Sequence, residues 1–166
     1  MKIRKLTTVA VLLALCVVGA NVKLMGSIAL DSFPAFLGAL LFGPWVGAFL
    51  GAFGHLISSM LSGFPLTIPI HLIIAALMAI CMAVFGFIRL RLGKSRWYSI
   101  LLADVCGYLI NVPLDLLFLY PLMHQAVIAL FIPLTIATVA NLVLTEVVYV
   151  ALPQRIKSLS FLGVTR

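Results

Sequence analysis

The sequence predicts an all-α integral membrane protein, a compact bundle of six transmembrane helices that forms one domain over residues 1–166. Three observations lead to this prediction: the chain is 64% hydrophobic, it is only 9% charged, and its long apolar stretches are separated by short stretches rich in Gly, Pro or charge. A soluble domain has about 25% charged residues, so lipid rather than water is the solvent that fits this composition. The apolar stretches lack the alternation of period two that strands of a membrane barrel need, which favours helices.

Each helix is expected between turn residues or charges. The six segments run over residues 6–20, 32–42, 45–61, 68–90, 98–120 and 125–152. A span needs about 20 mostly apolar residues, so the second segment, which ends at Gly43-Pro44, is short. The first segment follows a basic start, as in a signal peptide, but the remaining chain is equally apolar and we interpret the segment as a retained helix. Pro113 should kink the fifth segment, and Pro153 should end the sixth.

Small and weakly polar residues in these segments have a structural interpretation. Gly47, Gly51 and Gly54 share the third segment, and their spacing lets two helix backbones approach closely, so we expect internal packing there. The cysteines lie inside apolar runs without a metal-type spacing, and we expect buried free thiols. They are Cys16, Cys81 and Cys106.

The basic residues predict the orientation of the bundle. With six spans, the two termini, the Gly43-Pro44 turn and the loop at 89–96 share one side of the membrane. That side receives ten of the eleven Lys and Arg residues, namely Lys2, Arg4, Lys5, Arg89, Arg91, Lys94, Arg96, Arg155, Lys157 and Arg166. Basic residues accumulate in cytoplasmic loops, so both termini are predicted to be cytoplasmic. The net charge of +7 therefore reports topology, and we expect no nucleic-acid partner because no solvated basic face exists to bind one.

Polar side chains within the apolar segments predict a binding site near the outward ends of the helices. Buried polar groups are costly in lipid, so each needs a partner. The expected substrate-binding residues are Asp31, Phe33, His55, Ser59, Phe64, His71, Asn111, Asp115 and Tyr120, with Ser58 and His124 nearby. Asn111 and Asp115 are four residues apart and share a helical face. The aromatic residues, together with Phe36 and Phe118, would suit a flat and partly polar solute. The flexible loop 21–31, with Gly26 and Ser27, could act as a lid.

Several of these residues also have a purely structural interpretation. Asp31 could cap the second helix, His55 could be a packed core histidine, and His71 and His124 could face lipid headgroups. The carboxylate of Asp115 in mid-helix is the hardest to explain in that way. A second polar group, predicted to point inward and to be structural, consists of Asp104, Asn141, Thr145 and Glu146.

No motif for catalysis is present in the sequence. There is no H-E-x-x-H, no Walker loop and no nucleophile elbow, so we expect neither a catalytic residue nor ATP hydrolysis by this chain. The spacing of the histidines and aspartates does not support a metal site, and no cofactor is predicted.

The chain resembles a known family over its whole length, and two stretches carry most of the resemblance. They are AVLLA in the first segment and ALDSFPAFLGALLFGPWVGAFLGAFGHLISS across the second and third segments, with a P-x-x-x-G-x-x-x-x-G-P pattern inside it. These stretches resemble the S components of energy-coupling factor (ECF) transporters. The resemblance implies a high-affinity substrate-binding subunit in a prokaryotic cell membrane. Its implied partners are a transmembrane T component and two ATPases, and the implied function is uptake of a vitamin-type micronutrient.

The resemblance also suggests a partner surface and a substrate. The family's Ala-x-x-x-Ala surface, which contacts the T component, maps onto Ala10 and Ala14. ALDSFPAFLG followed by GHLISSMLSGFPLTIPIHL looks most similar to S components for α-ribazole, a precursor in cobalamin salvage that joins a flat dimethylbenzimidazole to ribose. The alternatives are riboflavin, cobalamin, pantothenate or a queuosine precursor as substrate, or a small membrane enzyme or assembly subunit.

Overall fold

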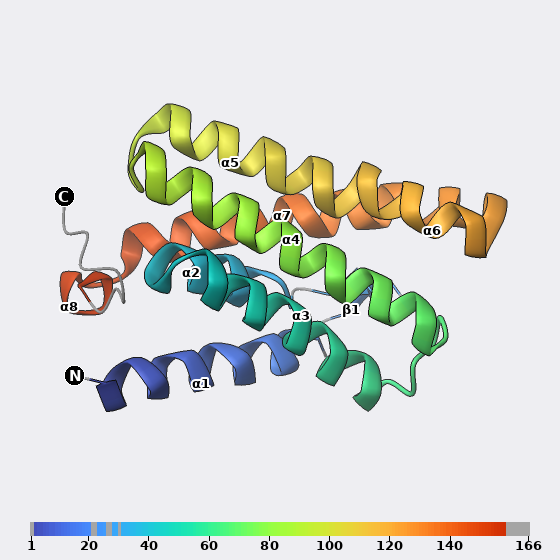
Figure 1. Ribbon diagram of the computed structural model, residues 1–166, viewed down its shortest axis with the longest axis horizontal. Coiled ribbons are helices and arrows are strands. Elements are labelled where there is room, and N and C mark those ends of the chain that lie inside the picture. The colour runs from blue at the N-terminus through green and yellow to red at the C-terminus, as the bar shows by residue number, and fades with distance from the viewer. Residues whose placement is uncertain (1, 21–22, 26–27, 30, 159–166) are drawn as a thin grey trace.

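The computed structural model describes residues 2–20, 23–25, 28–29 and 31–158, and these form a bundle of helices joined by short turns (Figure 1). The helices are α1 (Lys2–Gly19), α2 (Phe33–Phe42), α3 (Pro44–Leu61), α4 (Ile68–Leu92), α5 (Trp97–Leu109), α6 (Asp115–Met123), α7 (Phe131–Ala151) and α8 (Gln154–Lys157). Two short strands, β1 (Lys23–Met25) and β2 (Ile28–Ala29), pair antiparallel between α1 and α2. A π-helical turn, Ile110–Leu114, joins α5 to α6, and a 3-10 stretch, His124–Leu130, joins α6 to α7.

Apart from the short hairpin, the described chain is helical, as predicted. Helix boundaries lie within a few residues of the expected segments, with α5, the π-helical turn and α6 forming the fifth. The exception is α7, which begins at Phe131 although the sixth segment is expected from residue 125. Among the described residues, three stretches are long and apolar enough to cross a membrane: Pro44–Leu61, Ile68–Leu92 and the long stretch Trp97–Ala151. The last of these runs out through α5 and α6 and returns through α7 (Figure 1). Helix α2 is apolar but shorter. These helices support a membrane protein.

The two ends of the bundle differ in charge. Figure 1 places the N-terminus, α8, the α2–α3 turn and the α4–α5 loop at one end, and the α3–α4 turn and the α6–α7 connection at the other. The basic residues of α1, of the α4–α5 loop and of α8 therefore gather at one end, which we call the basic end. The structure thus brings together regions that the charge pattern assigns to one side of a membrane.

Helix α2 lies at the centre of the bundle. Every residue from Pro34 to Phe42 is buried, and the ring of Phe36 meets that of Phe85 on α4 edge-on at 4.9 Å. The outer helices keep apolar residues on their exposed faces, as shown by Val143, which is 57% exposed on α7. Such an outer surface would be unfavourable in water and suits the hydrocarbon core of a bilayer.

The glycines of α3 allow three different helices to approach it. A Cβ atom at Gly47 would lie 2.4 Å from the Cβ of Ala39 on α2, and one at Gly54 would lie 2.8 Å from the Cβ of Cys16 on α1. A Cβ atom at Gly51 would lie 3.2 Å from the carbonyl oxygen of Met78 on α4. The expected internal packing is confirmed, and so is the expectation of free cysteines, of which Cys106 is only partly buried.

Candidate functional site

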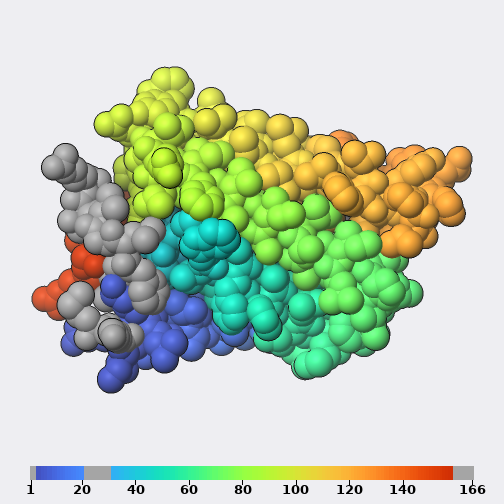
Figure 2. All heavy atoms as spheres, in the orientation of Figure 1, coloured from blue at the N-terminus to red at the C-terminus, as the bar shows by residue number. Residues whose placement is uncertain are grey.

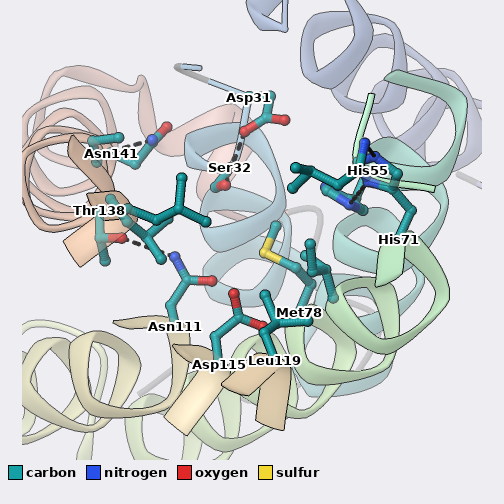
Figure 3. A pocket seen from close by; sticks show the side chains of 15 residues that line it. Asp31, Ser32, His55, His71, Met78, Asn111, Asp115, Leu119, Thr138 and Asn141 are labelled. Carbon is teal, nitrogen blue, oxygen red and sulfur yellow. Dashed lines mark hydrogen bonds between the residues drawn. The ribbon is translucent and has the colours of Figure 1, made fainter. Parts of the chain in front are cut away.

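A cavity lies within the bundle where α2, α3, α4, α7 and the π-helical turn meet (Figure 3). Its empty volume is about 690 Å³, a figure that includes the open mouth. The lining residues are Asp31, Ser32, His55, Leu66, His71, Ile74, Met78, Asn111, Asp115, Leu119, Leu130, Leu134, Ala137, Thr138 and Asn141. Polar groups thus enter from several sides of an otherwise apolar wall, which is the usual composition of a small-molecule site.

The π-helical turn positions Asn111 and Asp115 on one side of the cavity. The backbone N–H of Asp115 donates to the carbonyl of Ile110, five residues earlier, and Pro113 within this turn has no N–H to donate. Both side chains point into the cavity (Figure 3). The amide nitrogen of Asn111 donates to Thr138 Oγ1 at 2.9 Å, which ties this turn to α7. The prediction that Asn111 and Asp115 share a face is confirmed.

The carboxylate of Asp115 is buried and incompletely paired. Its side chain is only 6% exposed, and Oδ1 has no hydrogen-bond partner among the described residues. A buried polar atom without a partner costs about 1–3 kcal/mol. Because this atom lines an open cavity, a donor from a bound solute could satisfy it.

Two histidines and a serine form a hydrogen-bonded group on the opposite wall. His55 Nε2 lies 3.1 Å from His71 Nδ1, and Ser59 Oγ lies 2.9 Å from the same His71 atom. The backbone N–H of Leu66 points at His71 Nε2, 3.4 Å away, so that nitrogen accepts and Nδ1 carries the proton. Ser59 donates to the backbone oxygen of His55 at 2.8 Å, which leaves its oxygen free to accept from His71. In this arrangement His55 Nε2 is an acceptor and His55 Nδ1 carries a proton.

The start of α2 is held by α7 and not by Asp31. Asn141 Oδ1 accepts the backbone N–H of Phe33 at 2.8 Å, and Thr145 Oγ1 donates to the backbone oxygen of Phe33 at 3.3 Å. The hydroxyl of Ser32 donates to Asp31 Oδ1 at 3.0 Å, and Ser32 itself makes no side-chain cap. The capping role considered for Asp31 is therefore wrong, and its carboxylate lies at the cavity instead (Figure 3).

The cavity includes five of the nine expected substrate-binding residues. These are Asp31, His55, His71, Asn111 and Asp115. Ser59 lies behind the two histidines, and the ring of Phe64 lies 5.7 Å from that of His71. Phe33 contacts α7 through its backbone. Tyr120 lies on the outer side of α6 and is 49% exposed.

The other expected aromatic residues do not line the cavity either. Phe36 is in the core, and Phe118 is 54% exposed. Among the lining residues that the structure describes, the flat rings are imidazoles. His124 is exposed at the start of the 3-10 stretch, and Gly26 and Ser27 of the expected lid lie outside the described residues.

Sequence reasoning missed Ser32, Met78, Thr138 and Asn141. The sequence places Asn141 with the polar residues on the cytoplasmic side, but Asn141 lies in the cavity wall. The 3-10 stretch delays the start of α7 to Phe131 and so changes the depth of this residue. The available signal was the presence of two residues with polar side chains, Thr138 and Asn141, three positions apart in an otherwise apolar helix.

Two other members of that second group, Glu146 and Asp104, do not line the cavity. Arg89 on α4 is 1% exposed and forms an ion pair with Glu146 on α7, and it also donates to the backbone oxygen of Lys94. Asp104 on α5 has a buried Oδ1 without a hydrogen-bond partner among the described residues. The structural role predicted for Glu146 agrees with this ion pair. Within the described chain, no three His, Cys, Asp or Glu residues are grouped to hold a metal ion.

Comparison with known proteins assigns the family. Residues 4–153 match the model of the ECF transporter substrate-specific component. No curated protein and no solved structure matches the chain. The family match spans α2 to α7 and nearly all of α1, and it includes every residue that lines the cavity. Members of this family are substrate-binding transport subunits that act with T and ATPase components. The chain belongs to the family of substrate-specific components of ECF transporters.

Proposed function

We propose that this subunit captures an uncharged, hydroxyl-rich micronutrient from outside the cell, and that α-ribazole is the substrate. The observation that carries the proposal is the buried Oδ1 of Asp115, a residue that lines the cavity; this oxygen has no hydrogen-bond partner in the part of the chain that the structure describes. A solute hydroxyl that donates to it would form a charge-assisted hydrogen bond, a contact worth about 1.5–3 kcal/mol. The ribose of α-ribazole supplies such hydroxyls.

The charge of the cavity favours a neutral solute. Asp31 and Asp115 contribute carboxyl groups, and among the lining residues that the structure describes there is no Lys or Arg. A phosphate or carboxylate on the solute would meet negative charge without a cation to offset it. This disfavours pantothenate, which carries a carboxylate, and supports an unphosphorylated nucleoside-like solute.

The apolar part of the cavity suits a small ring system. Ile74, Met78 and Leu119 line it next to the imidazoles of His55 and His71. Methionine sulfur and neutral imidazole both pack favourably against aromatic rings. The dimethylbenzimidazole would lie between these groups, while the ribose lies near Asp115 and Asn111.

The two unlike ends of the protein support an orientation in the membrane. We propose six spans, with the basic end in the cytoplasm and the cavity open to the outside. In this orientation Ala10 and Ala14 are available to the T component. Both alanines are exposed on α1, which Figure 2 shows in blue along one edge of the molecule beside α3.

Binding by the detergent-purified subunit tests the proposal. Native mass spectrometry should find a co-purified solute, and calorimetric titration should give tight binding of α-ribazole. α-Ribazole 5′-phosphate and pantothenate should each bind at least about a hundredfold more weakly than α-ribazole. This difference corresponds to roughly 2.7 kcal/mol of binding free energy. Equal binding of the phosphorylated form would contradict the charge argument. Turnover of the solute by the isolated subunit would instead favour a membrane enzyme.

A further inference from the structure

A second hollow lies at the basic end, far from the substrate cavity. The α4–α5 loop, the end of α7 and α8 surround it, and its empty volume is about 1610 Å³, counting open solvent. Four basic residues line it, Arg91, Lys94, Arg96 and Lys157, and no acidic residue is among the described lining. We call these four residues and the space between them the basic groove.

The cations of the groove lack carboxylate partners. Among the described residues, the carboxylate of Glu146 pairs with Arg89, outside the groove lining, and no carboxylate oxygen lies within 4.0 Å of the four groove cations. Lys94 is partly buried in the α4–α5 loop, and this burial, together with the charge of Arg89, lowers the pKa of its ammonium group. Both effects penalise a positive charge that nothing nearby neutralises, so a bound anion would be favourable here.

Neighbouring tyrosines hold two of these cations in place. Arg96 donates to the hydroxyl of Tyr98 at 2.5 Å, and Lys157 lies 5.0 Å from the ring centre of Tyr149 while it donates to the backbone oxygen of Val150. The Arg96 guanidinium has five N–H groups and uses one of them for Tyr98, so others remain for an anion. Side chains that are already ordered lose less entropy when they bind a ligand.

The surroundings of the groove indicate that the anion belongs to a lipid. Trp97, at the start of α5, is 75% exposed beside the groove, and Leu101, one turn further, is 59% exposed. Trp at the end of a membrane helix marks the headgroup level, and exposed leucines beyond it face acyl chains. A lipid whose phosphodiester headgroup lies in the groove would therefore place its acyl chains against apolar side chains. A free phosphate has no acyl chains and would gain nothing from these contacts.

We propose that the basic groove binds the phosphate of an acidic phospholipid, with Lys94, Arg96 and Lys157 as its ligands. Basic pockets between helices at a cytoplasmic membrane surface are suited to this chemistry. The bound lipid would hold the α4–α5 loop and α8 together at the headgroup layer. The proposal is independent of the solute in the other cavity.

Native mass spectrometry of the full chain, released from nanodiscs of phosphatidylcholine with one fifth phosphatidylglycerol, tests the proposal. The wild type should retain phosphatidylglycerol, and a Lys94→Gln/Arg96→Gln variant should retain it at least about tenfold more weakly, the loss expected from one charge-assisted hydrogen bond or more. The matched control is Arg4→Gln/Arg155→Gln, which removes two charges at the same end but outside the groove and should change retention only a few-fold.

Two further measurements separate the alternatives. The single variant Lys157→Gln, which keeps the α4–α5 loop intact, should also lose lipid, so the test does not depend on the folding of the double variant. Inorganic phosphate at 10 mM should not displace phosphatidylglycerol from the wild type. Equal lipid retention by groove and control variants would overturn the proposal, and displacement by inorganic phosphate would show a site for free phosphate instead.

Discussion

Replacing Asp115 with Ala should weaken solute binding and at the same time stabilise the free protein. Asp115 is 6% exposed, and its Oδ1 has no hydrogen-bond partner within residues 31–158 or the other described segments. Loss of one charge-assisted hydrogen bond costs about 1.5–3 kcal/mol, so affinity should fall roughly ten- to a hundredfold. In the solute-free protein, the same change removes a buried polar atom that is unsatisfied, which should raise the free energy of unfolding by about 1 kcal/mol or more.

The two effects are measured separately and have a matched control. Calorimetric titration with α-ribazole gives the affinity, and thermal unfolding of the solute-free protein in detergent gives the stability. Asp104→Ala serves as the control, because Asp104 also has a buried unpartnered Oδ1 on the adjoining helix α5 but does not line the cavity. Asp104→Ala should leave affinity unchanged. If Asp115→Ala binds as tightly as wild type, or if Asp104→Ala loses affinity instead, the site is not where we propose it.

Other changes should separate binding, coupling and stability. His55→Ala should cost less affinity than the loss of a carboxylate, because a neutral imidazole offers one weaker bond, and titration would show the order. Ala14→Trp should block uptake and assembly with the T component while binding by the isolated subunit is kept; loss of that binding would mean that α1 packs internally there. Glu146→Gln should leave affinity nearly unchanged. It should lower the free energy of unfolding by about 3–5 kcal/mol, because the buried charge of Arg89 loses its carboxylate partner. An unchanged melting temperature would contradict this. Reporter fusions at the C-terminus and near Gly63 should lie on opposite sides of the membrane, and a shared side would rule out six spans.

The helices could be predicted from the sequence because lipid imposes simple rules. Each apolar run had to satisfy its backbone internally, so runs bounded by Gly43-Pro44 or Pro153 became helices with nearly the expected ends. Asp115 and Asn111 could be assigned to one face because helical spacing alone decides it. The packing of Gly47 and Gly54 followed from the same geometry.

The composition of the cavity wall could only partly be predicted. The depth of Asn141 depends on where the chain turns back after α6, and the 3-10 stretch that sets this depth has no clear signal in an apolar sequence. The aromatic residues are a second example. The rings of Phe36 and Tyr120 can both pack in apolar surroundings. Whether such a ring faces the core, the cavity or lipid depends on the rotation of its helix about its axis, which tertiary packing sets.

The π-helical turn has a consequence for how the site can change. Such a turn holds one residue more than the α-helical turn it replaces, so it stands as a one-residue insertion accommodated without breaking the helix. Each residue of an α-helix advances the side-chain direction by about 100°. In the π-helical turn each residue advances by less than this, because its backbone hydrogen bond spans five residues instead of four, so the helix after the turn keeps nearly the register it would have without the extra residue. In this helix, therefore, the turn can absorb a change of chain length: a chain that lacks Val112 would form a regular α-helical turn and would still direct Asp115 toward the cavity.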